Sequence, residues 1–158
     1  MQARIDYRNL EAGGYKAMLG LEQYLSKCSL DKKLLDLIRL RVSQVNGCAF
    51  CIDMHWKDLQ VQGESEQRMY GLDAWRESPY YSERERAALA WSEAVTHLEA
   101  GRVPDDVYEE TRKHFSQQEL ADLTLAIVAI NGWNRLNIAF RTAAGAYQPG
   151  EVLLKKSA

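Results

Sequence analysis

The 158-residue chain has only three prolines, Pro79, Pro104 and Pro149, so long stretches run without a residue that breaks helices. It also lacks any window in which apolar and polar residues alternate steadily between turn residues, the pattern of a half-buried β-strand. Apolar residues recur instead at spacings of three and four, which is the period of an amphipathic helix. We therefore expect an all-α fold with six or seven helices.

Long apolar runs and an excess of one charge are absent as well. No segment reaches the roughly 18 uncharged apolar residues of a membrane-spanning helix, and the N-terminus lacks the apolar core of a secretory signal. The 20 Lys and Arg residues nearly balance the 22 Asp and Glu residues and are interspersed with them. The chain therefore offers no basic field to nucleic acid or an anionic membrane. We expect a soluble, cytoplasmic protein with neither partner.

Composition and length are those of an ordinary globular domain. Apolar types make up 46% of the residues and charged types 27%, which excludes a disordered, collagen-like or coiled-coil chain. The length is close to the roughly 150 residues of one compact domain. Because the chain shows no repeat, low-complexity tract or evident linker, we expect a single domain over residues 1–158.

Capping and turn residues divide the chain into helices. Two capping boxes, Ser82–Glu85 and Ser116–Glu119, each predict the start of a helix, and Gly47 predicts the end of another. The expected helices are 10–27, a segment from the N-cap Ser29 to Gly47, 48–63, a short piece before Gly71, one from Ser82 that ends by Gly101, 104–114, and a last helix from Ser116 that extends at most to Gly145.

Cysteine is scarce too, and three cysteines are too few for the disulfide framework of a small secreted protein. Cys28 ends the first expected helix and is interpreted as a half-buried structural thiol. Cys48 and Cys51 form a C-x-x-C pair, which in a reducing compartment indicates redox chemistry or metal binding. If a helix begins near Cys48, then at about 100° per residue Cys51 lies about 60° from it and His55 within about 20°. Both sulfurs and the imidazole then share one side of the helix.

Each of these three positions has a chemical use. A cysteine in the first turn lies against unpaired backbone N–H groups and the positive end of the helix dipole, which favour the reactive thiolate. Cys48 is thus expected to be an exposed nucleophile. Cys51, one turn deeper, can close a disulfide with an oxidised Cys48, and His55 beside it can take up a proton.

Zinc binding is an alternative use of the same residues. Cys48, Cys51 and His55 are three candidate ligands. Tetrahedral structural zinc needs a fourth, and only His97 or Asp36 is left to supply it, because the chain has no second C-x-x-C. A thioredoxin fold is excluded, since its C-x-x-C lies in a βαβ unit. We favour a redox-active pair over a metal site or a plain buried pair, and we expect no bound metal.

Asp36 lies on the helix that precedes the C-x-x-C pair. Asp36, Leu40 and Ser43 share one side of that helix, and this side leads to the turn that presents Cys48. A carboxylate there can orient or deprotonate His55, directly or through a water. The alternative is a solvated charge on an amphipathic helix, which the spacing alone slightly favours.

The stretch Asn131–Asn137 is unusually polar for a helix that otherwise has a core-like composition. Such residues line a site or pair across a subunit interface, and we favour the interface.

Residues 34–55, LLDLIRLRVSQVNGCAFCIDMH, resemble the signature segment of the carboxymuconolactone decarboxylase superfamily in its alkylhydroperoxidase D branch. The resemblance extends through residues 81–90 and 122–137, and so covers most of the chain. It implies an all-helical subunit that assembles into trimers or hexamers and reduces hydroperoxides through the two cysteines without a bound cofactor. The decarboxylase branch lacks the cysteine pair, which argues against lactone decarboxylation here.

In that branch a glutamate twelve positions before the first cysteine, a bridging water and the histidine form a proton relay to the second cysteine. Cys48, Cys51 and His55 match this pattern directly. The glutamate position falls on Asp36, one methylene shorter, and Phe50 stands where other members have a histidine. The resemblance therefore favours a functional role for Asp36 over a solvated charge.

The predicted activity is that of a thiol-dependent hydroperoxide reductase with Cys48, Cys51, His55 and Asp36 as its catalytic residues. The resemblance implies an external thiol reductant, such as a lipoyl or thioredoxin-like protein. The alternatives are a general thiol-disulfide oxidoreductase of the same family, a non-catalytic oligomer and a zinc-stabilised protein. Which cysteine attacks first stays open, because Cys51 is the one nearest the base.

Overall fold

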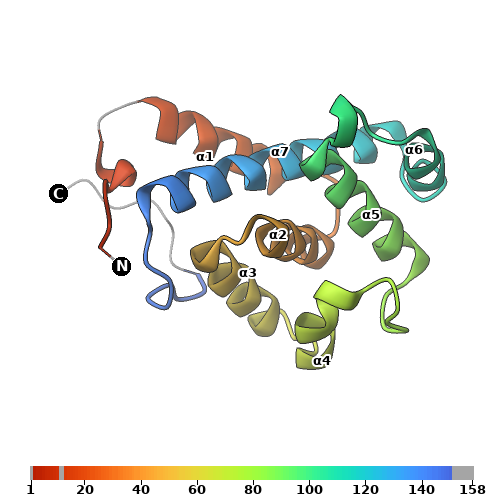
Figure 1. Ribbon diagram of the computed structural model, residues 1–158, viewed down its shortest axis with the longest axis horizontal. Helices are drawn as coiled ribbons and strands as arrows, with labels where there is room; N and C mark the ends of the chain where they lie inside the picture. Colours follow the sequence, from red (N-terminus) through yellow and green to blue (C-terminus); the bar gives the residue numbers. More distant parts are fainter. Residues whose placement is uncertain (1, 11–12, 151–158) are drawn as a thin grey trace.

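The computed structural model describes residues 2–10 and 13–150, which form helices and loops without a strand (Figure 1). The prediction of an all-α fold with six or seven helices is confirmed within these residues. The helices are α1 Gly13–Leu25, α2 Lys32–Asn46, α3 Ala49–Val61, α4 Glu66–Tyr70, α5 Glu83–His97, α6 Asp105–Thr111 and α7 Gln117–Phe140, with short 3-10 helices η1 Tyr7–Asn9, η2 Gly71–Ala74 and η3 Glu99–Gly101. None of the helices in the described part combines the length and apolar composition needed to cross a membrane.

Helix α2 lies at the centre of the molecule, where α3, α5 and α7 all pack against it (Figure 1). Its residues 34–38 are consecutively buried, as expected for a helix that is covered on every side. Leu35 and Ile38 belong to one apolar cluster, and Leu37 and Leu40 belong to a second. A polar side chain at this part of α2, such as Asp36, therefore lies inside the protein.

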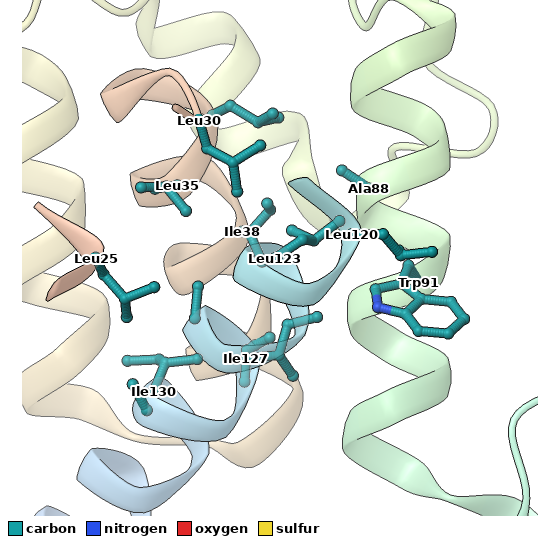
Figure 2. Packing of buried hydrophobic residues seen from close by; sticks show 14 of the residues in the cluster. Leu25, Leu30, Leu35, Ile38, Ala88, Trp91, Leu120, Leu123, Ile127 and Ile130 are labelled. Carbon is teal, nitrogen blue, oxygen red and sulfur yellow. The ribbon is translucent and has the colours of Figure 1, made fainter. Parts of the chain in front are cut away.

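The first cluster joins α2 to α5 and α7 (Figure 2). Ile38 of α2 packs with Leu123 and Ile127 of α7, and Trp91 of α5 lies on the other side of α7. Each buried Leu or Ile side chain contributes about 1.5–3 kcal/mol by leaving water. Cys48 and Cys51 belong to this cluster, and Cys28 is partly buried against it, as predicted.

The start and end of α2 decide where the C-x-x-C pair lies. Asp31, not the predicted Ser29, is the N-cap, because its carboxylate accepts the backbone N–H of Leu34 at 3.0 Å. Gly47 ends α2 in the left-handed conformation (φ 69°), as predicted. The backbone N–H of Cys48 bonds Ser43 O at 3.0 Å across this turn, and Cys48 becomes the N-cap of α3.

Both predicted capping boxes are present, at Ser82 and Ser116. The two helices that they open end within the predicted limits of Gly101 and Gly145. Leu98 stops α5 and Arg141 stops α7, each in the left-handed conformation. After Arg141 the chain returns to α3, where Lys57 Nζ donates to two backbone carbonyls of this segment. These contacts hold the chain away from a helical path.

Candidate functional site

The C-x-x-C pair lies at the start of α3, next to α7. Cys48 is 1% exposed and Cys51 is 0% exposed, so the prediction of an exposed Cys48 is wrong for this chain. Cys48 does lie at the N-terminus of a helix, as predicted, but α7 packs against that helix, and the thiol is buried. Both cysteines are free thiols.

The two thiols interact with each other. The neighbouring Cys51 side chain holds the pKa of Cys48 below its usual value even though burial opposes the charge. The Cys48 side chain, together with burial, raises the pKa of Cys51. Cys48 therefore loses its proton first, and Cys51 remains the thiol that stabilises it.

Two asparagine amides on α7 face the sulfur pair. Asn137 Nδ2 lies 3.5 Å from Cys51 Sγ, and the Asn134 amide favours the ionised form of both cysteines. Ser43 Oγ accepts a hydrogen bond from Asn134 Nδ2 at 3.1 Å, and Asn46 Nδ2 donates to Asn134 Oδ1 at 2.8 Å, so the Asn134 amide is fixed.

The predicted interface role is wrong for Asn134 and Asn137, because both are buried within the single chain. A signal for this was present in the sequence. Ile127 and Ile130 lie on the buried side of α7, and Asn134 and Asn137 continue the same spacing of three and four. Asn134 and Asn137 are three positions apart, as are Cys48 and Cys51.

Asp36 and His55 lie together, as predicted. Asp36 is 3% exposed and His55 5% exposed, and His55 Nδ1 is 3.7 Å from Asp36 Oδ1. Arg39 Nη1 donates to Asp36 Oδ1 at 3.0 Å, and Gln62 Nε2 donates to Asp36 Oδ2 at 2.7 Å. Asp36 is thus a buried, anchored carboxylate and not a solvated charge.

The surroundings of Asp36 keep it ionised. Burial alone would raise its pKa, but His55, Arg39 and Gln62 outweigh burial and hold the pKa of Asp36 well below its usual range. Arg39 is itself held by Glu22 of α1 at 2.7 Å. The negative charge of Asp36 is therefore present at neutral pH beside the imidazole.

Both ring nitrogens of His55 are buried, and neither has a hydrogen-bond partner among the described residues. The ring therefore makes no hydrogen bond to Cys51, although both lie on α3. An unpaired buried polar group costs about 1–3 kcal/mol, and such groups in native proteins are often catalytic. The imidazole is free to accept a proton on one nitrogen and to face Asp36 with the other.

A cavity of about 800 Å³ opens beside these residues. Its wall includes His55 and Asp36 from one side and Asn137 and Trp133 of α7 from another. Tyr7 of the N-terminal segment lines it as well. The cysteines are not part of this wall, but Asn137, whose Nδ2 lies 3.5 Å from Cys51 Sγ, is.

Within residues 2–10 and 13–150 no group of three His, Cys, Asp or Glu side chains has an arrangement that could hold a metal ion. His97, one of the two residues that could supply the fourth zinc ligand, is exposed in the last turn of α5. The structure thus places Asp36 beside His55 and Cys48 beside Cys51.

Comparisons with known proteins agree on a family. The sequence model of the carboxymuconolactone decarboxylase family matches residues 13–94. The uncharacterised protein YdfG of Bacillus subtilis (strain 168) is 44% identical over 146 residues, which span 92% of this chain and 99% of YdfG.

Solved structures agree as well. A protein of unknown function from Agrobacterium tumefaciens, suggested to be the antioxidant defence protein AhpD, superposes with a TM-score of 0.88 at 43% identity, over 92% of this chain and 100% of that one. An uncharacterised peroxidase-related protein from Ralstonia eutropha JMP134, described as an alkylhydroperoxidase AhpD core, has the same fold, with a TM-score of 0.75 at 18% identity over 84% and 71% of the two chains. This chain therefore belongs to the carboxymuconolactone decarboxylase family, in its AhpD-like branch.

Proposed function

We propose that the protein is a thiol-dependent hydroperoxide reductase that uses Cys48 and Cys51. The observation that carries the proposal is the buried thiol pair, in which the neighbouring Cys51 holds the pKa of Cys48 below its usual value and so favours a thiolate there. A thiolate is the nucleophilic form of cysteine, and the neighbouring thiol is within reach to form a disulfide. The suggested antioxidant role of the Agrobacterium tumefaciens relative is consistent with this chemistry.

The proposed reaction has two steps on the enzyme. The Cys48 thiolate attacks one oxygen of the hydroperoxide, the O–O bond breaks, and the alkoxide takes a proton and leaves as an alcohol. Cys48 is then a sulfenic acid. Cys51 loses its proton and attacks the Cys48 sulfur, the S–O bond breaks, and water leaves as the disulfide forms. An external thiol, such as a lipoyl or thioredoxin-like protein, supplies two electrons to reduce the disulfide.

His55 and Asp36 serve the proton transfers in this scheme. His55 accepts the proton that Cys51 releases and passes it to the leaving oxygen, so that water departs, and the charged Asp36 carboxylate lies 3.7 Å from the imidazole ring. The anchoring of Asp36 by Arg39 and Gln62 keeps that carboxylate in place during the reaction.

We also propose that the subunit forms a homo-oligomer, a trimer or hexamer. Leu125 and Val128 are exposed apolar residues three positions apart on α7, so this side of the helix offers apolar surface to another copy.

Thiol titration with and without an organic hydroperoxide tests the proposed activity. The native protein should lose the thiols of Cys48 and Cys51, and turnover should continue when dihydrolipoamide or thioredoxin is supplied. Cys28→Ser is the matched control and should behave as the native protein, because Cys28 lies outside the pair. Unchanged thiols would refute the proposal, as would reduction of disulfide substrates without reduction of hydroperoxides.

A further inference from the structure

A chain of hydrogen bonds reaches Cys51 from the side of α7. Asn137 Nδ2 lies 3.5 Å from Cys51 Sγ and donates to Trp133 O at 2.9 Å. The hydroxyl of Tyr7 donates to Asn137 Oδ1 at 3.0 Å. The amide has two N–H groups, so one serves Trp133 and the other is available for the sulfur.

These partners fix which way the amide points. Trp133 O can only accept, so it needs the N–H side of Asn137, and the Tyr7 hydroxyl donates to the carbonyl side. A flipped amide would place its oxygen against the carbonyl of Trp133 and the sulfur of Cys51. The N–H donor is therefore directed at Cys51 before any reaction begins.

The N-terminal segment brings Tyr7 to this position. The backbone N–H of Arg4 bonds Phe140 O at 3.0 Å, and the rings of Tyr7 and Phe140 are 5.7 Å apart, which ties this segment to the end of α7 (Figure 1). Burial raises the pKa of Tyr7 to about 12, so its hydroxyl keeps its proton at neutral pH and remains a donor. Tyr7 and Asn137 both lie outside residues 13–94, which the family's sequence model matches.

We propose that Asn137 is a catalytic residue that stabilises the Cys51 thiolate during disulfide closure, and that Tyr7 is the residue that positions it. The inference rests on the proposed function. In the closing step the S–H bond of Cys51 and the S–O bond of the Cys48 sulfenic acid break, the S–S bond forms and water leaves. Negative charge passes through a sulfur that is fully buried, and a directed N–H donor lowers the cost of that charge.

Two variants test the proposal in a Cys28→Ser background treated with an organic hydroperoxide. Asn137→Leu removes the donor at similar volume and should slow disulfide closure about tenfold, because a hydrogen bond to a charged group is lost. Tyr7→Phe removes only the hydroxyl that orients the amide and should slow closure by a smaller factor. In both variants the Cys48 sulfenic acid, trapped with dimedone, should accumulate.

A pH titration of the Cys51 thiol distinguishes a direct effect of Asn137 on the thiolate from a purely structural role. In Cys28→Ser/Cys48→Ser protein, the NMR shift of the Cys51 β-carbon reports the thiolate as pH is varied. Adding Asn137→Leu or Tyr7→Phe should move the midpoint to higher pH. Tyr24→Phe, which removes a hydroxyl bonded to Asp122 elsewhere on α7, is the matched control and should leave it unchanged.

The outcomes separate the two proposals. If the native protein forms neither a sulfenic acid nor a disulfide with hydroperoxide, the proposed function fails, while the titration still tests Asn137. An unmoved midpoint together with unchanged closure in Tyr7→Phe and Asn137→Leu would overturn the role of both residues. If Asn137→Leu does not fold, the Tyr7→Phe result alone decides.

Discussion

The carboxylate of Asp36 is held from three directions, since His55, Arg39 and Gln62 all approach its two oxygens. A buried charge is stable only when such partners compensate for lost hydration. Arg39 and Gln62 hold the carboxylate by hydrogen bonds, whereas His55 Nδ1 lies 3.7 Å from Asp36 Oδ1. The imidazole can therefore move or exchange protons while the carboxylate stays in place. This arrangement separates the structural partners of Asp36 from its proposed chemical partner.

Removal of this charge should slow the reaction with peroxide. In Asp36→Asn the imidazole of His55 loses its neighbouring carboxylate, which orients the ring for proton transfer, so the thiol pair should give up its proton more slowly at neutral pH. The rate should fall about tenfold or more near neutral pH, and the deficit should shrink as pH rises and thiolate forms unaided. A pH series of peroxide-dependent thiol oxidation measures this. Asp106→Asn, an exposed aspartate of α6, is the control.

Asp36→Glu should be at least as active as the native protein, because one more methylene brings a carboxylate oxygen within hydrogen-bond reach of the ring now 3.7 Å away. A native rate in Asp36→Asn across neutral pH would show that the charge has no role in the chemistry.

Asp36 should also make the free energy of unfolding depend on pH in the acid range. Its pKa is lower in the folded protein than the ordinary value of 3.8, so its stabilising contribution is present above that value and is lost as pH falls through the folded pKa. At neutral pH Asp36→Asn should be less stable than the native protein by about 1–3 kcal/mol, and the gap should close as pH falls below 3.8. Urea unfolding at a series of pH values measures the gap. A gap that widens toward acid pH would contradict the argument.

At the scale of elements, the turn between α2 and α3 places the thiol pair. Gly47 has φ 69°, and a Cβ built there would meet no atom within 4 Å, so the backbone conformation alone requires glycine. Gly47→Ala should therefore destabilise the protein by about 1 kcal/mol. Gly20→Ala inside α1 is a matched control. It should stabilise the protein by about 0.5–1 kcal/mol, because alanine favours a helix more than glycine does. Urea unfolding of both variants at one pH tests the pair, and a stabilised Gly47→Ala would be the contradictory result.

The helices themselves were largely predictable, because their signals are local. The capping boxes at Ser82 and Ser116 and the glycine at Gly47 each act within one turn, and all three have the predicted role. The N-cap of α2 was placed at Ser29 instead of Asp31, since both residue types cap well and the sequence does not show which one precedes the first turn. The end of α7 depends on tertiary contacts of the returning chain and has no such local signal.

At the scale of the whole molecule, the site combines segments that are far apart in sequence. Cys51 and Asn137 are 86 positions apart, and Tyr7 and Asn137 are 130 apart. The proximity of Asp36 to His55 could be predicted because adjacent helices and a family pattern connect them. The burial of Cys48 and the contact of Asn137 with Cys51 could not, because they depend on how α7 crosses the start of α3.

The proposed assembly belongs to this scale as well. Val128 lies exposed on α7, three positions from Leu125, so Val128→Lys should place a charge in the proposed contact between subunits. Light scattering should report a trimer or hexamer for the native protein and a smaller species for the variant, with unchanged helix content by circular dichroism. A monomeric native protein would contradict the assembly. An unchanged mass in the variant would show that the contact between subunits does not involve Val128.

The central claim is that Cys48 is the nucleophile and Cys51 the thiol that first stabilises and then resolves it. Mass spectrometry of dimedone-trapped sulfenic acid after hydroperoxide treatment tests this most directly in two variants. Cys51→Ser should carry the label on Cys48, because the serine hydroxyl can donate to that sulfur, and Cys48→Ser should carry no label on Cys51, because burial still opposes ionisation of that thiol. A label on Cys51 in the second variant, or no label in either, would contradict the account.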